Sequence, residues 1–205
     1  MLNIRHKIRQ FRFHFIKNKI DFNGGGKSVI CNNCTGAMVL HDYGIRFDTP
    51  TVNLFIRPKF YIEMLRDLSH YLNADIVDIS NGNKYPIGLL DDKVRIDFLH
   101  YETFDDAVKA WKRRAGRIDL NNIYVVLVER DGCTYDDLLQ FDKLPFKHKV
   151  ALVHKEYPEI HCSYVIRCPQ EKGLLGQIIN YQGFFGKRYY DQFNWSDFLE
   201  LNKKI

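Results

Sequence analysis

The feature that most constrains the fold is a fully apolar run of six residues, Ile123–Val128. A strand that is apolar on both faces is typical of a sheet that is covered on both sides. Shorter strand-like runs lie on either side of it in the sequence, and segments with helical spacing separate them, for example residues 103–114 and 134–141. This alternation predicts a single-domain α/β fold with a mostly parallel or mixed sheet.

Apolar patterning predicts further strands and helices along the chain. Alternating or continuous apolar residues predict strands, and apolar residues that repeat every three or four positions predict helices. Gly44 and Pro58 are residue types that end and start helices, and Thr103 and Ser196 are residue types that cap them. The predicted strands are 28–32, 52–56, 75–79, 85–90, 94–99, 149–153 and 163–167, and the predicted helices are Thr35–Tyr43, 60–72 and 196–201.

The positive charge of the chain is concentrated at its N-terminal end. Residues 1–20 carry six Lys and Arg and no Asp or Glu, whereas the whole chain has a formal net charge of +5. The remaining residues are close to neutral, with 24 basic against 25 acidic side chains. A protein that binds nucleic acid is expected to carry a basic surface on its folded body. We therefore predict no nucleic-acid partner.

Residues 1–22 are predicted to form a basic amphipathic helix. Its apolar face would consist of residues that step by four, three and four: Ile4, Ile8, Phe11 and Phe15. A Gly-rich joint at 23–27 would separate this helix from an α/β domain at 28–205. The helix could lie on an anionic membrane surface through residues 1–20, or it could pack on its own domain or on a partner subunit.

The cysteine count and the N-terminal sequence predict the compartment. An odd number of cysteines, five, in a chain of this size favours reduced thiols. Charges interrupt any apolar segment that could act as a secretory signal, and no run of 18 apolar residues could span a bilayer. We expect a cytoplasmic protein, with a peripheral position at the inner face of the cell membrane if the N-terminal helix binds lipid.

The sharpest candidate for chemistry is the turn that follows the predicted strand 28–32. Small polar residues separate this strand from the helix Thr35–Tyr43, and ligands of α/β proteins bind at the carboxyl ends of strands. Cys34 lies next to the helix N-terminus, where the pKa of a thiol is lowered and its nucleophilicity is raised. The arrangement is similar in outline to the nucleophile elbow of α/β hydrolases, although Asn32 stands where that motif has its first Gly.

Two other interpretations of this turn stay open. Cys34 could be a small residue that packs at a tight turn, since a buried cysteine is usually unreactive. Asn32 and Asn33 could satisfy backbone groups of the turn, or their amides could bind the hydroxyl groups of a sugar. The turn is therefore a candidate site for nucleophilic catalysis or for substrate binding.

Two histidines are candidates for a general base. His41 lies seven residues after Cys34, which places both on the same side of the predicted helix. His100 closes the predicted strand 94–99, and a strand end is a common location for functional side chains. A solvent-exposed or structural role is the alternative for His41.

Three arginines cluster at the end of a predicted helix. Arg113 and Arg117 are four residues apart and would share one helical face, from which they could bind a phosphate or a carboxylate. The alternative is a solvated basic helix end that interacts favourably with the helix dipole. We include Arg114, together with Asn53 and Tyr101, among the substrate-binding candidates.

Metal and nucleotide motifs are not supported by the spacing of the residues. Cys31 and Cys34 have the spacing of half a zinc site, but residues i and i+3 of a strand point to opposite faces and no second pair follows. Lys27 and Ser28 follow three glycines, yet a phosphate-binding loop requires a preceding strand and a following helix. We therefore predict no metal and no cofactor.

Several short blocks occur in an order that is typical of one bacterial family: residues 31–36, 49–55, 85–88, 98–101, 111–114 with 117–118, and 130–132. On these blocks, the chain resembles a bacterial domain of unknown function whose members are often named exopolysaccharide biosynthesis proteins. The resemblance covers residues from about 28 to 190. It implies an α/β fold and an association with capsule and exopolysaccharide genes, and it implies no particular catalytic residue.

Two hypotheses about function follow. The first is a transferase that acts on a sugar or a lipid-linked glycan precursor. It would work by acyl transfer through a thioester if Cys34 is the nucleophile, or by glycosyl transfer if the arginines bind a nucleotide-sugar. The second is a non-catalytic accessory protein that binds a glycan precursor or another enzyme of polysaccharide biosynthesis. A nucleophile and a base within hydrogen-bond reach would favour the first hypothesis in its acyl-transfer form.

Overall fold

Four parallel strands form the main sheet of the computed structural model, which describes residues 2–19 and 27–201. Their order across the sheet is β1 (Ser28–Cys31), β5 (Ile123–Val128), β6 (His148–Val153) and β7 (Ser163–Val165). Every residue of β5 is buried, as its apolar sequence requires. The prediction of a single-domain α/β fold with a mostly parallel or mixed sheet is confirmed.

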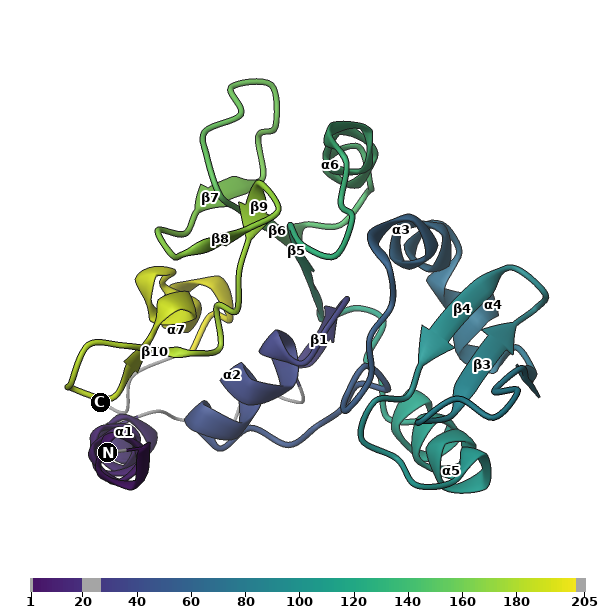
Figure 1. Cartoon of the computed structure of the whole chain (residues 1–205), viewed down its shortest axis with the longest axis horizontal. Coiled ribbons are helices and arrows are strands. Elements are labelled where there is room, and N and C mark those ends of the chain that lie inside the picture. Colours follow the sequence, from purple (N-terminus) through teal and green to yellow (C-terminus); the bar gives the residue numbers. More distant parts are fainter. Residues whose placement is uncertain (1, 20–26, 202–205) are drawn as a thin grey trace.

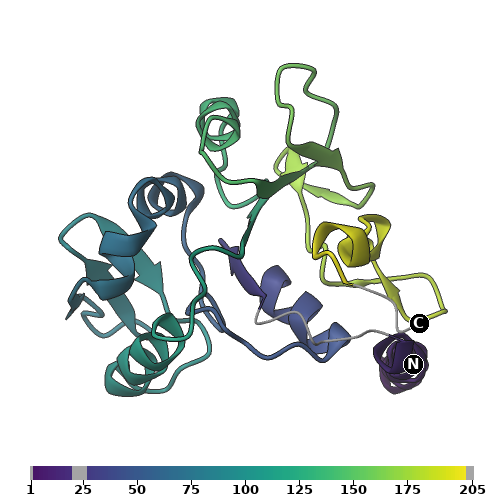
Figure 2. The ribbon, with the colours of Figure 1, turned by 180° about the vertical axis from the view of Figure 1, so that it is seen from behind.

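Helices cover both faces of this sheet (Figures 1 and 2). The helices on one face are α3 (Pro58–Arg66) and α6 (Tyr135–Asp142), and those on the other face are α2 (Thr35–Tyr43) and α7 (Trp195–Phe198). Val125 and Leu127 of β5 belong to the core on the α3 side, whereas Val126 and Val128 belong to the core on the α2 side. Successive side chains of a strand point to opposite faces, so a strand between two cores carries no polar position.

A smaller lobe, inserted between β1 and β5, forms one end of the molecule (Figure 1). It consists of α4 (Leu68–Asn73), the antiparallel strands β2 (Ile76–Asp78), β3 (Ile87–Leu90) and β4 (Val94–Asp97), and the helix α5 (Phe104–Ala115). Thr103 caps α5 as the sequence predicts, because its side chain accepts a hydrogen bond from the N–H of Asp106. Trp111 of α5 is buried in the core, which fixes the helix against the lobe.

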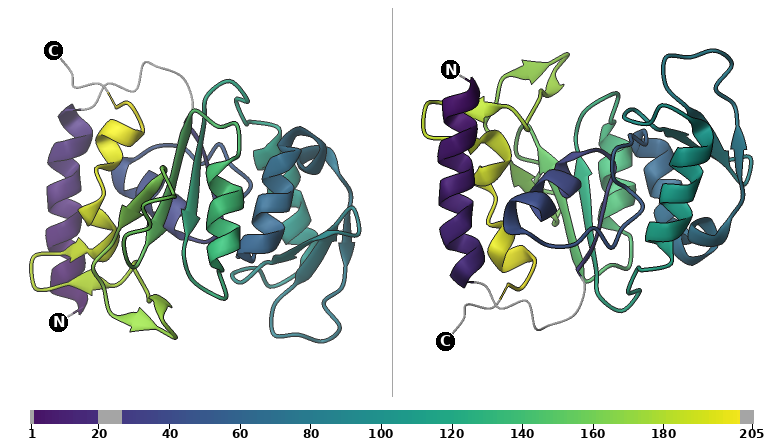
Figure 3. Two further views of the ribbon diagram at one scale, coloured as in Figure 1. Left: turned by 90° about the horizontal axis from the view of Figure 1, so that it is seen from above. Right: turned by 90° about the horizontal axis from the view of Figure 1, so that it is seen from below.

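The opposite end of the molecule combines the N-terminal helix with segments from the C-terminal part of the described chain (Figure 3). It contains α1 (Leu2–Lys19), the hairpin of β8 (Gln170–Glu171) and β9 (Leu174–Leu175), the hairpin of β10 (Tyr181–Gln182) and β11 (Lys187–Arg188), and the 3-10 helix η1 (Tyr189–Gln192). The predicted N-terminal helix is present at Leu2–Lys19, whereas residues 1 and 20–22 of that prediction and most of the predicted joint at 23–27 lie outside the described residues. Among the described helices, none is long and apolar enough to cross a bilayer.

A buried arginine anchors α1 to the rest of the protein. Arg9 is 2% exposed, and its guanidinium donates to Asp191 at 2.6 Å and to Asp42 at 3.1 Å. It also donates to the hydroxyl of Tyr190 at 3.0 Å. Burial disfavours the charge, but the two carboxylates outweigh it and hold the pKa of Arg9 above its ordinary value. We call this network, which consists of Arg9, Asp42, Tyr190 and Asp191, the α1 anchor.

Two predicted helices differ from the structure at their caps. The predicted helix 60–72 is two helices, because Asp67 leaves the helical conformation and caps α4 by accepting a hydrogen bond from the N–H of His70. The last helix begins one residue earlier than predicted and is capped by Asn194, not by Ser196. Both differences follow from a side chain that satisfies the free N–H groups of a helix start.

The predicted strand 52–56 is wrong. Phe55 alone forms a bridge, to Asp97 at the end of β4. Asn53 has a φ of 64°, in the left-handed region, which is incompatible with a strand and which Asn tolerates better than most residues. The other predicted strands are present, with ends that shift by one or two residues.

Candidate functional site

A cleft of about 1230 Å³ runs along α2, and we call it the α2 cleft. Its lining comes from the turn after β1, the segment 52–55, the turn after β5 and one side of α1. Because α1 and α5 lie on opposite sides of α2 (Figure 1), residues from both ends of the molecule contribute to it. Six of the predicted site residues line this cleft: Asn33, Cys34, His41, Asn53, His100 and Arg114.

Cys34 lines the cleft at the N-cap of α2, but its surroundings do not activate it. The thiol donates to the carbonyl oxygen of Leu54 at 3.8 Å. Burial raises the pKa of the Cys34 thiol above its ordinary value, so the prediction of a lowered pKa was wrong. Within the described residues, no imidazole or carboxylate forms a hydrogen bond with this thiol. His41 follows two helical turns later, about 10 Å along the helix axis.

The residues on either side of this turn hold the sheet and the helix together. Asn32 is buried, and its side chain accepts a hydrogen bond from the N–H of Val128 at 2.9 Å and donates to the carbonyl oxygen of Val128 at 3.3 Å. This amide continues the pairing of β1 with β5 beyond the end of β1. Gly36 allows α2 to approach β1, since a Cβ there would lie 2.7 Å from the Cβ of Cys31. Asn32 therefore binds the backbone and lies outside the cleft lining.

Three further predicted residues present polar groups to the cleft. The side-chain oxygen of Asn33 accepts a hydrogen bond from the N–H of Thr35 at 3.0 Å, so its NH₂ group remains as a donor toward a ligand. The carbonyl oxygen of Asn53 accepts from the N–H of His100 at 3.4 Å, which holds these two residues side by side. The side chain of His100 is exposed at the cleft.

One of the three predicted arginines reaches the cleft. Arg114 lines it and donates to the hydroxyl of Tyr101 at 2.6 Å. Tyr101 in turn lies 3.5 Å from the carbonyl oxygen of Val52, to which its hydroxyl donates. Tyr101 is outside the cleft lining, so the structure places it as a residue that positions Arg114.

The other two arginines do not share a helical face, and the prediction of such a pair was wrong. The helix α5 ends at Ala115, before Arg117. Arg117 forms an ion pair with the buried Asp48 at 3.3 Å, and it donates to the carbonyl oxygen of Phe47 at 2.7 Å. Arg113 is exposed and lies outside the cleft lining.

The cleft also contains cations that the sequence interpretation missed. Lys17 comes from α1 and Arg188 from β11. Arg188 donates to the carbonyl oxygen of Ile179, and its Nε is buried without a hydrogen-bond partner. Within the described part of the chain, Lys17, Arg114 and Arg188 form no ion pair, and we call these three residues the cleft cations.

The turn after β5 carries charges that a strand-end rule could have found. Arg130 and Asp131 lie in the turn after β5, line the cleft and form an ion pair with each other at 2.6 Å. Ligands of α/β folds bind at the carboxyl ends of strands, so the predicted central strand was a signal for this turn. For Lys17 and Arg188 the sequence offers no such signal, because they come from the two ends of the chain.

The buried carboxylate of Glu129 stabilises the turn after β5. Glu129 is 1% exposed and lies 2.7 Å from Nδ1 of His154. It also accepts a hydrogen bond from the hydroxyl of Tyr157 at 2.6 Å. Burial, together with the hydrogen bond to Glu129, raises the pKa of the Tyr157 hydroxyl. This cluster fixes the segments after β5 and β6 and does not line the cleft.

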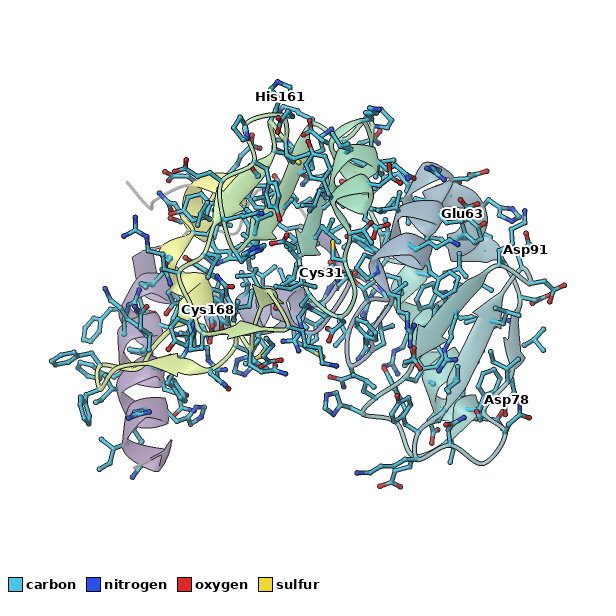
Figure 4. The ribbon with its side chains drawn as sticks, turned by 45° about the horizontal axis from the view of Figure 1, so that its top comes forward. Cys31, Glu63, Asp78, Asp91, His161 and Cys168 are labelled. Atoms are coloured by element: carbon cyan, nitrogen blue, oxygen red, sulfur yellow. The ribbon has the colours of Figure 1, made fainter. Side chains whose placement is uncertain are left out.

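The cysteines and acidic residues are dispersed over the molecule. Cys31 lies in its middle, whereas His161, Asp91 and Asp78 lie at its periphery (Figure 4). Burial raises the pKa of the Cys31 thiol to about 12, which keeps it protonated. In the ranges 2–19 and 27–201, no group of three or more His, Cys, Asp or Glu side chains is placed to hold a metal ion.

These features define an α/β protein with a large, cation-lined cleft at the carboxyl end of a parallel sheet. The chain belongs to the family described as domain of unknown function DUF1919, which matches residues 4–200. It is similar to an uncharacterized protein of Haemophilus influenzae, with 37% identity over 170 residues that cover 83% of this chain and 82% of that protein. The predicted resemblance to a domain of unknown function is confirmed, and the predicted link to exopolysaccharide biosynthesis stays a prediction.

Proposed function

We propose that this protein is a glycosyltransferase of exopolysaccharide or capsule biosynthesis, which binds phosphate-containing sugar precursors in the α2 cleft. The observation that carries this proposal is the set of cleft cations without carboxylate partners. A guanidinium binds phosphate oxygens through paired, charge-assisted hydrogen bonds, and it is weakly hydrated enough to do so in a cleft. The polysaccharide context comes from the resemblance of the sequence blocks.

The cleft has room for two substrates. Its volume of about 1230 Å³ exceeds what one small ligand needs, since pockets for such ligands hold roughly 300–1,000 Å³. We assign the diphosphate of a nucleotide-sugar donor to Arg114, beside Asn53 and His100. We assign the diphosphate of a lipid-linked acceptor to Lys17 and Arg188, at the end of the cleft that α1 lines.

The proposed reaction exchanges one bond at the anomeric carbon of the donor sugar. The bond from this carbon to the phosphate oxygen breaks, and a bond to a hydroxyl oxygen of the acceptor forms. The hydroxyl proton passes to the imidazole of His100, which is exposed to the cleft and later releases the proton to solvent. The nucleoside diphosphate leaves with the bonding electrons, and Arg114 stabilises its added negative charge.

Acyl transfer through Cys34 receives less support than glycosyl transfer. A cysteine nucleophile is activated by an adjacent base or by a lowered pKa. Cys34 instead donates to the carbonyl oxygen of Leu54, and burial raises the pKa of its thiol. The same observation favours the second candidate function, a non-catalytic protein that binds a glycan precursor for another enzyme.

The proposal includes a location in the cytoplasm, at the inner face of the cell membrane. All five cysteines are free, as is typical of proteins in a reducing compartment. Lipid-linked precursors reside in the membrane, so an enzyme that uses them has to work at its surface.

The test is a titration of the full chain with UDP-glucose, UDP-N-acetylglucosamine and GDP-mannose by calorimetry. We expect one of these donors to bind and Arg114→Met to weaken the binding at least about tenfold, since a charge-assisted contact to phosphate is lost. Arg113→Met is the matched control, because Arg113 precedes Arg114 on α5 and lies outside the cleft. If Arg114→Met bound the nucleotide-sugar with unchanged affinity, the proposed donor site would be wrong.

Turnover separates the two candidate functions. With the bound donor and a lipid extract as acceptor, glycosyl transfer releases the nucleoside diphosphate, which chromatography detects. We expect His100→Ala to keep donor binding and to lower the rate by about 100-fold, as is typical for the loss of a general base. Donor binding without any release would support the accessory protein.

A further inference from the structure

Four apolar side chains of α1 point away from the protein. They step along one helical face and are between 38% and 67% exposed: Ile4, Ile8, Phe11 and Phe15. The opposite side of the helix faces the cleft, whose lining includes His6, Lys17 and the buried side chains of Arg9 and Phe13. α1 therefore has the α2 cleft on one side and an apolar face, exposed in the described structure, on the other.

The tip of the β10–β11 hairpin adds two aromatic side chains beside this face. Phe184 and Phe185 are 69% and 79% exposed. The Arg5 guanidinium lies 5.4 Å from the centroid of the Phe184 ring, and a Cβ on Gly186 would lie 2.6 Å from the carbonyl oxygen of Arg5. The hairpin is therefore held against α1, as both views in Figure 3 show. We call the combined patch the α1 surface: Ile4, Ile8, Phe11, Phe15, Phe184 and Phe185.

Positive charge borders the α1 surface. The helix α1 contains several Lys and Arg and no Asp or Glu, and Lys7 is exposed while Arg12 is partly exposed. The hairpin adds the exposed Lys187. An apolar face with basic side chains along its edges is typical of a helix that lies in the interface of an anionic membrane. A second copy of the chain would bring an equally basic surface against this one, and like charges oppose such a dimer.

We propose that the α1 surface docks on an anionic lipid bilayer. The α1 anchor fixes the helix to the body, so the apolar side chains enter the membrane while the opposite side of α1 keeps its place in the cleft wall. This inference deepens the proposed function and rests on it for one consequence: the cleft opens beside the membrane, where the diphosphate of a lipid-linked precursor can reach Lys17 and Arg188.

The test is flotation of the full chain with vesicles of phosphatidylcholine alone or mixed with phosphatidylglycerol. We expect binding to the mixed vesicles, weaker binding to the neutral vesicles, and release at high salt, because the lysines and arginines attract anionic headgroups. The double variant Phe184→Ser with Phe185→Ser should weaken the binding at least about tenfold, since the bilayer no longer buries two aromatic side chains. Both residues are highly exposed, so this variant should remain folded.

A control variant removes two exposed apolar side chains elsewhere on the protein. Val77 and Leu120 are 53% and 52% exposed and do not belong to the α1 surface, so Val77→Ser with Leu120→Ser should float like the natural protein. The proposal is overturned by unchanged flotation of the Phe184/Phe185 variant, by equal binding to neutral and anionic vesicles, or by a dimer in light scattering that this variant dissociates. Titration with a soluble nucleotide-sugar needs no membrane, so the proposed function is tested separately.

Discussion

Arginines in two regions of this molecule have opposite surroundings. In the α1 anchor, the guanidinium of Arg9 lies between the carboxylates of Asp42 and Asp191. In the cleft, Arg130 pairs with Asp131, but Arg114 donates to a tyrosine hydroxyl and Arg188 to a carbonyl oxygen, which are neutral acceptors. A guanidinium that is neutralised by carboxylates connects segments of the protein, whereas one with neutral acceptors keeps its charge for an anionic ligand. The partners of an arginine, more than its position in a helix, separate a structural role from a binding role.

The largest effect on stability is expected at the α1 anchor. Arg9→Met leaves two carboxylates without their common partner, and Asp191 is 5% exposed. Removing one partner from a buried ion pair costs about 3–5 kcal/mol, because the remaining charge stays desolvated. We expect the free energy of unfolding in guanidinium chloride to fall by that amount.

Arg12→Met is the control for this change. Arg12 also pairs with Asp191, at 3.4 Å, but it is 37% exposed, and surface pairs contribute about 0–1 kcal/mol. If Arg9→Met and Arg12→Met destabilised the protein equally, the α1 anchor would not be a buried network, and the contrast with the cleft would disappear.

The second-largest effect on stability is expected in a comparison of two neutral side chains, one buried in the sheet and one at the cleft. Asn32 is buried and binds the N–H and the carbonyl oxygen of Val128, whereas Asn53 is exposed at the cleft. Asn32→Ala leaves two buried backbone groups without partners, and we expect a loss of about 2–3 kcal/mol in thermal or chemical unfolding. Asn53→Gly keeps the left-handed backbone and should change stability by less than about 0.5 kcal/mol. A reversed order of the two variants would contradict the assignment of Asn32 to the sheet.

Local patterns in the sequence were enough to predict the fold and about half of the residues of the candidate site. The apolar run of β5 and the cap at Thr103 depend on neighbouring residues, and both were predicted. The turn at Asn33 and Cys34 lines the cleft because it follows the carboxyl end of the parallel strand β1. His100 reaches the same cleft from the antiparallel sheet of the smaller lobe, after the end of β4.

The rest depends on contacts between residues that are distant in the chain. Arg9 meets Asp191 across 182 positions, so no local pattern could show that an arginine of the N-terminal helix is buried. Arg188 and Lys17 reach the cleft only because the two ends of the chain pack together. The pKa of Cys34 was predicted from the helix N-terminus alone, whereas burial of the thiol in the folded chain raises it.

A smaller effect is expected in the reactivity of Cys34. Since burial raises the pKa of its thiol above the ordinary value, less thiolate is present at pH 8 than in a free cysteine. We expect iodoacetamide to label Cys34 several-fold more slowly than the same peptide in the unfolded protein, and the rate to rise as the pH increases beyond 9. Peptide mapping by mass spectrometry gives the rate at this site. If Cys34 were labelled faster in the folded protein than in the unfolded chain, it would be an activated nucleophile and the prediction would be wrong.

The smallest effect on stability is expected for Arg114→Met, which should have the largest effect on donor binding. Arg114→Met removes one hydrogen bond to a neutral hydroxyl, and Tyr101 still donates to the carbonyl oxygen of Val52, so unfolding should change by less than about 1 kcal/mol. The control Arg113→Met should change neither unfolding nor donor binding. A loss of several kcal/mol in Arg114→Met would mean that this arginine is structural, as Arg9 is. An unchanged stability combined with weakened donor binding would show that a guanidinium with neutral partners keeps its charge for a ligand.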